Sequence, residues 1–264
     1  MVRLISSEWM KTKRTMVRWI NFFLPLLISG CIIGYVALRG MSSDFQMTTF
    51  QTFFEIWTIF VIPIGVGILA GYVVHQEELA SSFNGFLSLR LPRYKLYLVK
   101  FFPLSIIIMI STFLATIVFY IGITLIFPEL SNIWLFFLIA AILVIIGTLP
   151  IIAIHLWVSF AWGTGVSIGI GICGLLMAGL IGRTSLGNSI WQFIPWTVPV
   201  RLVKNLSPYL LFSANMTTPP PLVSSGWAVK QFLIGITSVG VCLFIVLLCG
   251  MIWFSKWEGR KYYE

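Results

Sequence analysis

Residues able to do acid–base or nucleophilic chemistry are scarce in this chain. Its 264 residues include two histidines and eight acidic residues. The acidic residues are Glu8, Asp44, Glu55, Glu77, Glu78, Glu129, Glu258 and Glu264. We expect none of them deep in an apolar segment, and His155 is a lone imidazole with no carboxylate near it in the sequence. General acid–base catalysis needs such groups beside one another, so we predict no covalent chemistry for this chain.

Motifs that bind a nucleotide or zinc are also missing. The sequence contains no G-x-x-x-x-G-K-[ST] loop to cradle phosphates and no H-E-x-x-H helix to bind zinc. The four cysteines form no C-x-x-C pair and stand in apolar runs, where we expect them to pack as small side chains. We therefore predict that the chain binds no cofactor or metal. Any energy from ATP would enter through another protein.

Composition indicates a membrane protein. Hydrophobic residues make up 59% of the chain, charged residues 9%, and the mean hydropathy is +1.00, whereas soluble domains carry about 25% charged residues. A net charge of +9 is compatible with nucleic-acid binding. Basic residues placed beside membrane spans on the inner side explain the same charge by topology alone. We predict an integral membrane protein that binds no nucleic acid.

Apolar runs of about 20 residues, long enough for a helix to cross roughly 30 Å of hydrocarbon, define the elements. The run from 133 to 182 is too long for one crossing, and Trp157, Trp162 and Gly163 are among the residues that interrupt it, so we divide it near 156–164. The predicted spans are 19–38, 56–74, 101–127, 133–155, 164–182 and 231–254. The predicted fold is all-α, with residues 1–264 forming one six-helix membrane domain.

Most of the seventeen basic residues lie in three segments, namely 1–18, 75–100 and the stretch after 254. Because cytoplasmic loops are enriched in Lys and Arg, we predict that both termini and the loop 75–100 are cytoplasmic. Residues 1–18 have a basic face and an apolar face, which predicts an amphipathic helix lying on the inner surface of the lipid bilayer. The residues selected on this helix are Arg3, Trp9, Lys11, Arg14 and Arg18.

The run HQEELASSFNGFLSLRLPRYKLYLVK, residues 75–100, predicts a short cytoplasmic helix followed by a basic hinge. Leu79, Phe83 and Phe86 share one helical face, and Glu77 and Glu78 stand in what would be its first turn, where the helix dipole favours negative charge. Such a helix can be held by another protein or lie as an ordinary loop on the lipid surface. The residues alone favour neither.

Residues 183–227 are long for a loop and contain Trp191, Pro195, Trp196 and Pro199. Tryptophan favours the headgroup level and proline prevents a further full span, so we predict a broken or re-entrant segment on the outer side. These four residues are candidates for contact with a substrate or are plain interfacial anchors.

Small residues recur four apart in the fifth span, as at Ser167 and Gly171, Gly165 and Gly169. Spacing of this kind allows close contact between helices. Contact within one subunit and contact between two subunits both remain open.

Three segments together resemble a known family. They are LISSEWMKTKRT at 4–15, the segment 75–100, and IWQFIPWTVPVRL at 190–202. In this order and with this topology, the chain resembles the permease subunits of ABC transporters that confer immunity to lantibiotics, most of all the G-type member of the two-permease systems.

The resemblance implies the fold of a type-2 ABC exporter permease. Residues 1–18 would be its elbow helix, and a coupling helix within 75–100 would dock on an ATPase. The implied contact residues of the coupling helix are Gln76, Glu77, Glu78, Leu79, Phe83, Asn84 and Phe86. A second coupling turn would include His155, Trp157 and Trp162.

The resemblance also implies a function: an ATP-driven exporter that expels a cationic, membrane-active lantibiotic and so protects its producer. The implied partners are a dimer of ABC ATPase subunits, which would bind ATP and Mg, and a second permease subunit in a heterodimer or homodimer. The implied location is the cytoplasmic membrane of a Gram-positive bacterium. Two alternatives stay open, namely an exporter of another antibiotic or amphipathic toxin peptide, and an ATP-independent membrane scaffold or intramembrane enzyme.

Overall fold

The computed structural model describes residues 6–10, 16–40, 45–81, 83, 87–88, 92–210 and 221–259. Helices dominate, and no strand occurs in these ranges. Within the same ranges, six helical segments are long and apolar enough to cross a membrane. The predicted all-α, six-span fold is therefore confirmed.

The spans combine helices of different types. The first is α2, Met16–Arg39, and the second joins α3 (Phe45–Ile56), the π-helical turn η1 (Trp57–Val61) and α4 (Ile62–Ser81). The third is α6, Arg93–Ile126, and the fourth joins the 3-10 helix η2 (Pro128–Ile133) to α7 (Trp134–Trp162). The fifth combines α8 (Thr164–Met177) with the π-helical η3 (Ala178–Gly182), and the sixth is α12, Trp227–Ser255.

Several helices extend well beyond the predicted spans. The second was predicted at 56–74, whereas the helical segment covers Phe45–Ala80, 36 residues. A helix of that length is about 54 Å long, so its ends project past a hydrocarbon layer roughly 30 Å thick. The prediction from apolar runs misses these ends because they contain polar residues such as Gln51 and Glu78. Such residues are compatible with a helix but interrupt an apolar run. The predicted loop 75–100 is correspondingly shorter, since α4 ends at Ser81 and α6 begins at Arg93.

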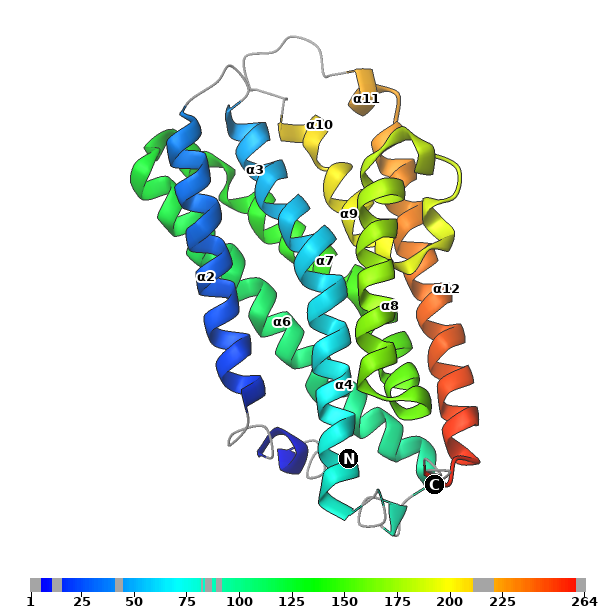
Figure 1. Cartoon of the computed structure of the whole chain (residues 1–264). Helices are drawn as coiled ribbons and strands as arrows, with labels where there is room; N and C mark the ends of the chain where they lie inside the picture. The colour runs from blue at the N-terminus through cyan, green and yellow to red at the C-terminus, as the bar shows by residue number, and fades with distance from the viewer. Residues whose placement is uncertain are drawn as a thin grey trace.

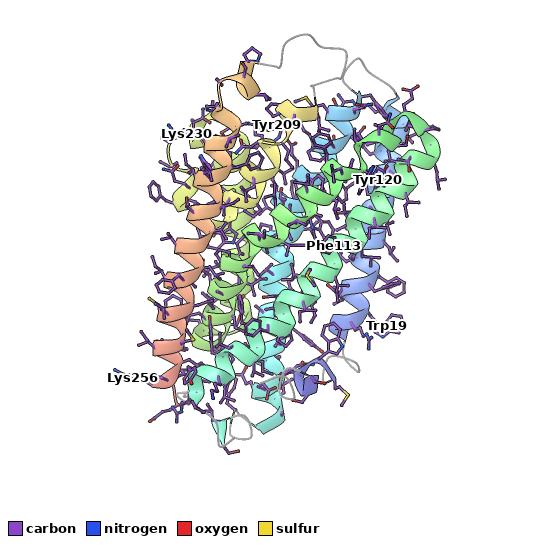
Figure 2. The ribbon with its side chains drawn as sticks, turned by 180° about the vertical axis from the view of Figure 1, so that it is seen from behind. Trp19, Phe113, Tyr120, Tyr209, Lys230 and Lys256 are labelled. Carbon is purple, nitrogen blue, oxygen red and sulfur yellow. The ribbon has the colours of Figure 1, made fainter. Side chains whose placement is uncertain are left out.

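The helices form one upright bundle in which α4 lies beside α8, and α2 packs on α6 (Figure 1). The second and fourth spans are the most enclosed, with 61% and 56% of their most apolar windows buried, against 11% for α12. Residues 6–10 and the C-terminal ends of α4 and α12 lie at the same end of the bundle, which we call the terminal end (Figure 1). Lys256 stands at the terminal end of α12 and Lys230 near its opposite end (Figure 2).

The junction between α7 and α8 is a single residue, Gly163. Its φ of 92° and ψ of −177° lie in a region that is essentially restricted to glycine. The break that we predicted over 156–164 is too wide, because α7 continues without interruption to Trp162. One glycine is enough to reverse the chain and start the fifth span.

Between η3 and α12 the chain folds back into the bundle. It forms η4 (Ser185–Gly187), η5 (Trp191–Phe193), η6 (Pro195–Thr197), α9 (Val198–Lys204) and α10 (Ser207–Leu210), and α11 (Pro221–Ser224) precedes α12. We call residues 185–204 the re-entrant segment. Its Trp196 lies beside Gly174 of α8, which is about 12 Å along the axis from the end of η3 at Gly182.

Glycines on three spans make room for the re-entrant segment. A Cβ atom on Gly174 would overlap the indole of Trp196, and one on Gly147 would come within 3.2 Å of Pro199. On α12, a Cβ on Gly235 would meet Leu202 and Trp191. The segment is therefore packed between α7, α8 and α12, and does not lie across their ends.

We expect Gly163→Ala to destabilise the protein by roughly 1–3 kcal/mol, because alanine must adopt the glycine-only conformation of this junction. Thermal unfolding of the purified protein in detergent, followed by tryptophan fluorescence, measures the effect as a lower Tm. Gly165→Ala is the matched control, since nothing lies within 4 Å of the added Cβ and the position is helical. An unchanged Tm for Gly163→Ala would contradict this account of the junction.

Candidate functional site

The residues predicted to couple the chain to an ATPase lie at the end of α4. Gln76, Glu77, Glu78 and Leu79 are in the last turns of α4, which runs to Ser81, and not in the first turn of a separate helix as we predicted. The helix continues because no proline or glycine stands between His75 and Ser81. Asn84 and Phe86 lie outside the described residues.

A buried lysine holds this end of α4 in place. Lys100 of α6 is only 2% exposed, and its Nζ donates to Glu77 Oε1 at 2.5 Å and also to Glu8 Oε2. The two carboxylates come from α4 and from the short helical stretch 6–10. A buried ammonium group is stable only with such partners, so the three segments are held together by one charged group.

Glu77 therefore has a different position from the one expected of a contact residue. It is 8% exposed and directed at Lys100, so it fixes the end of α4 from inside. Glu78 lies next to His75, with Oε2 3.0 Å from Nδ1. Leu79 is 74% exposed and faces outward.

Phe83 follows α4 in a conformation that is unusual for a bulky residue. Its φ is 66°, its backbone N–H donates to the carbonyl oxygen of Glu77 at 3.2 Å, and its side chain is 1% exposed. A left-handed phenylalanine is strained and persists only where the surroundings hold it. Its ring packs 5.0 Å from that of Trp257 and 6.4 Å from that of Phe160, between centroids, and these contacts help to hold it.

Phe83 belongs to a group of rings that we call the terminal aromatic cluster: Phe83, Tyr97, Phe160, Phe254 and Trp257. Within it, Phe160 lies 4.8 Å from Phe254 and 5.3 Å from Trp257, between ring centroids. The Tyr97 hydroxyl donates to the carbonyl oxygen of Ala153 at 2.8 Å. The cluster thereby joins the connection after α4 to α6, α7 and α12.

Together, Lys100 and the terminal aromatic cluster make the terminal end one rigid unit. Arg93, the first residue of α6, adds a hydrogen bond from Nη1 to the carbonyl oxygen of Trp257 at 2.5 Å. Aromatic pairs and charge-assisted hydrogen bonds each add stability beyond simple burial. A force applied to the connection between α4 and α6 would therefore act on four spans.

The predicted elbow helix is described in part. Residues 6–10 are helical, and Trp9 is half-buried. Arg18 is exposed near the start of α2. Arg3, Lys11 and Arg14 lie outside the described residues.

His155 does not lie on the predicted second coupling turn. It is fully buried, two helical turns before Gly163, with Nδ1 3.1 Å from Ser167 Oγ. Because α7 continues to Trp162, His155 faces α4 and α8 instead of the bundle end. Trp157 is half-buried, and Trp162 is 59% exposed beside Gly163.

Residues 165–169 read G-V-S-I-G and match the G-x-S-x-G pattern of some serine hydrolases, a pattern that we had wrongly taken to be absent from this sequence. Ser167 also contacts His155, and a serine beside a histidine is the arrangement that an intramembrane serine hydrolase would need. The Ser167 hydroxyl donates to the carbonyl oxygen of Gly67 at 2.9 Å, so the hydrogen in the histidine contact comes from Nδ1. A histidine that donates to the serine is not its general base, and the pattern lies within a helix instead of a strand–turn–helix elbow.

At the opposite end, the predicted outer residues are mostly inside the protein. Trp191 is 2% exposed, Pro199 is buried, and Pro195 and Trp196 are half-buried. Phe193, at 77% exposed, is the outward-facing aromatic residue of the re-entrant segment, and no pattern singled it out. The sequence indicates which segment is irregular but not which of its rings face outward.

Arg201 anchors the re-entrant segment. Its guanidinium group donates to Asn188 Oδ1 at 2.9 Å and to the carbonyl oxygens of Ile181 and Thr184 at 3.1 and 2.5 Å. Carbonyl groups at a helix end lack partners within the helix, so Arg201 satisfies the end of the fifth span. Nearby, Glu55 forms an ion pair with Arg183 at 2.9 Å, which gives this carboxylate a structural partner.

A second feature is an apolar groove between α2, η1–α4 and α6, which we call the central groove. Its internal volume is about 60 Å³. Trp57, Gly65 and Ile108 are among its walls, and its polar groups come from Asn21, Ser111 and Thr112. The π-helical turn η1 forms part of it, and such turns occur frequently at functional sites.

A comparison with known families decides the class of the protein. Residues 4–177 match the family described as ABC-2 family transporter protein. The chain belongs to this family. No curated protein matches it.

As an ABC-2 transporter chain, the protein is the membrane component of a transporter and spans the membrane several times. Members of the family normally work with an ATPase subunit. In the described part of the chain, no group of three or more His, Cys, Asp or Glu residues could hold a metal ion. The matched region includes the terminal-end residues of α4, α6 and α7 but not the re-entrant segment or α12.

We expect Lys100→Met in this ABC-2 chain to lower the free energy of unfolding by roughly 3–5 kcal/mol, because Glu8 and Glu77 lose the cation that compensates for their burial. Thermal unfolding in detergent reports the change. Adding Glu8→Gln and Glu77→Gln to Lys100→Met removes the two carboxylate charges and should recover most of the loss. If Lys100→Met unfolds at the temperature of the unchanged protein, the buried ion pairs do not stabilise the terminal end.

Proposed function

We propose that this chain is the permease subunit of an ATP-driven exporter and that a separate ATPase subunit docks at its terminal end, beside the last turn of α4. The observation that carries the proposal is the rigid unit built on Lys100 and the terminal aromatic cluster. An ATPase moves the spans of a permease only if it holds a part that is firmly attached to them. ATP and Mg would then be bound by the ATPase dimer.

The docking surface in this proposal is smaller than the sequence suggested. Leu79 supplies an exposed apolar side chain, and Trp162 supplies an exposed ring at the junction of α7 and α8. Exposed apolar groups of this kind are typical anchors of protein interfaces. Glu77, Phe83 and His155 are all buried, so in this proposal they hold the surrounding helices in position and do not contact the ATPase.

The proposed orientation places the terminal end in the cytoplasm. Arg93 and Lys95 at the start of α6 and Lys256 after α12 lie at this end, and Lys and Arg are enriched on the cytoplasmic side of membrane proteins. This orientation puts the docking surface in the compartment that holds ATP. The re-entrant segment would then face the outer side.

The proposed substrate is a lantibiotic, and the proposed role is self-protection of a producer in the cytoplasmic membrane of a Gram-positive bacterium. The resemblance of segments 4–15, 75–100 and 190–202 supports this substrate. The central groove supports it too, because an apolar wall with a few polar groups suits the apolar face of an amphipathic peptide. An exporter of another antibiotic or toxin peptide would use the same features, and a second permease subunit, different or identical, would complete the transporter.

We expect Leu79→Asp to weaken ATPase binding by about 2 kcal/mol, roughly thirtyfold in affinity, because a charge replaces an apolar anchor at the proposed interface. The measurement is recovery of the ATPase with tagged permease purified from native membranes in mild detergent. Leu186→Asp is the control, since Leu186 is 75% exposed at the opposite end, compared with 74% for Leu79. Absence of any ATPase from the unchanged protein, with a known transporter as reference, would favour an ATP-independent scaffold.

We expect Gly65→Leu to abolish protection against the lantibiotic while leaving ATPase recovery unchanged, because the new side chain fills the central groove. Nothing lies within 4 Å of a Cβ on Gly65, so the backbone need not move. Gly240→Leu is the control, because its Cβ is equally unobstructed on an exposed part of α12. Growth at increasing lantibiotic concentration gives the result, and full protection by Gly65→Leu would rule out the central groove as the substrate site.

A further inference from the structure

A second groove lies at the terminal end between residues 6–10, α2 and α6, and shares Asn21 with the central groove. Its walls are Ile107, Ile110 and Leu114 of α6, which face Trp9 and Phe22. Its internal volume is about 200 Å³. Pockets that hold a whole small organic molecule have about 300–1,000 Å³, so this terminal groove has room for only part of a lipid, such as a stretch of one acyl chain.

The terminal groove is apolar along α6 and polar along α2. Arg18 and Asn21 line it one helical turn apart, near the N-terminal end of α2. No carboxylate among the described residues pairs with Arg18, and Glu8, on the neighbouring helical stretch, is engaged by Lys100. The first turn of α2 contains no acidic residue, so the helix dipole adds to the positive potential there. The charge of the groove suits an anion.

The position of the terminal groove restricts the kind of anion. Ile107, Ile110 and Leu114 lie within the candidate span Arg93–Ile126, and they make this side of the groove apolar, which suits an acyl chain. Trp9 is the kind of residue that marks the boundary between hydrocarbon and headgroups. In Figure 2, Trp19 of α2 points away from the bundle at the same end. A ligand here needs a negative head and a long apolar tail.

We infer that the terminal groove binds one anionic phospholipid, with its phosphate at Arg18 and Asn21 and an acyl chain along α6. Basic pockets between spans on the cytoplasmic side of membrane proteins are known to bind anionic lipid headgroups. The bound lipid fills the space between the helical stretch 6–10 and the pair α2–α6. Because Glu8 on the same stretch is bound to Lys100, the lipid supports the segment that positions the end of α4. Neither the ATPase nor the transported substrate is needed for this binding.

Native mass spectrometry of the purified chain, incubated with phosphatidylglycerol or phosphatidylcholine of identical acyl chains, tests the inference. We expect the unchanged protein to retain one phosphatidylglycerol in preference to phosphatidylcholine. Arg18→Gln should weaken phosphatidylglycerol binding about fivefold and remove the preference. Ile110→Trp should lower the retention of both lipids, because the indole occupies the place of the acyl chain. Inorganic phosphate at the same concentration should not displace the lipid.

Two control variants match these changes in chemistry and exposure. Arg39→Gln removes the same charge at the other end of α2, and Ile121→Trp adds the same ring to α6 at a residue that is 52% exposed, compared with 42% for Ile110. Both should bind lipid like the unchanged protein. Equal retention of the two lipids, unaltered binding by Arg18→Gln or Ile110→Trp, or displacement by phosphate would overturn the inference. A lipid-free dimer would also overturn it, since a second copy would then cover the groove.

Discussion

The burial of the Lys100 ammonium group is the constraint on which the terminal end depends. A charged amine inside a protein loses its hydration, and it remains stable only where carboxylates replace the lost water. Here the carboxylates come from α4 and from the stretch 6–10, two segments that are far apart in sequence. If either segment shifts by one residue along its helix, its carboxylate turns away from Lys100. The ion pairs therefore fix how far α4 and the stretch 6–10 lie along their axes relative to Lys100. Phe83 follows α4 directly, so its strained conformation depends on this position of α4.

Close contacts of α4 continue from the terminal end into the middle of the bundle. On α4, Gly67 and Gly71 allow α8 to approach so closely that a Cβ on either glycine would touch α8. Ser167 of α8 donates to the Gly67 carbonyl and contacts His155, whose ring lies 6.0 Å from that of Trp196, between centroids. A continuous series of contacts thus leads from the end of α4 to the tip of the re-entrant segment. In the proposed transporter, close contacts of this kind would pass a displacement at the end of α4 to the re-entrant segment.

The six spans could be predicted because their apolar runs are long and contain few charges. An irregular segment within the predicted outer loop 183–227 could also be predicted from its prolines and tryptophans. The pairing of Lys100 with Glu77 and Glu8 was not predictable, because it depends on which helices become neighbours. For the same reason His155 was placed on a turn, although α7 continues past it and buries it. Glu77 and Phe83 were predicted as contact residues of a coupling helix, whereas both side chains are buried. Their pattern, however, does not distinguish a side chain that contacts a partner from one that holds the chain in shape.

Polar groups inside the bundle are largely occupied by hydrogen bonds within the fold. Ser29, Thr58 and Ser167 each donate to a backbone carbonyl oxygen, so these hydroxyls are already used in the fold. A polar group in the hydrocarbon is costly unless it is paired, which favours residues with a structural role over free reactive groups. The charged residues that remain accessible, such as Arg18 and Lys95, lie towards the terminal end of the bundle. This distribution of polar groups fits the proposed role of a permease subunit that transmits a movement started by a separate ATPase.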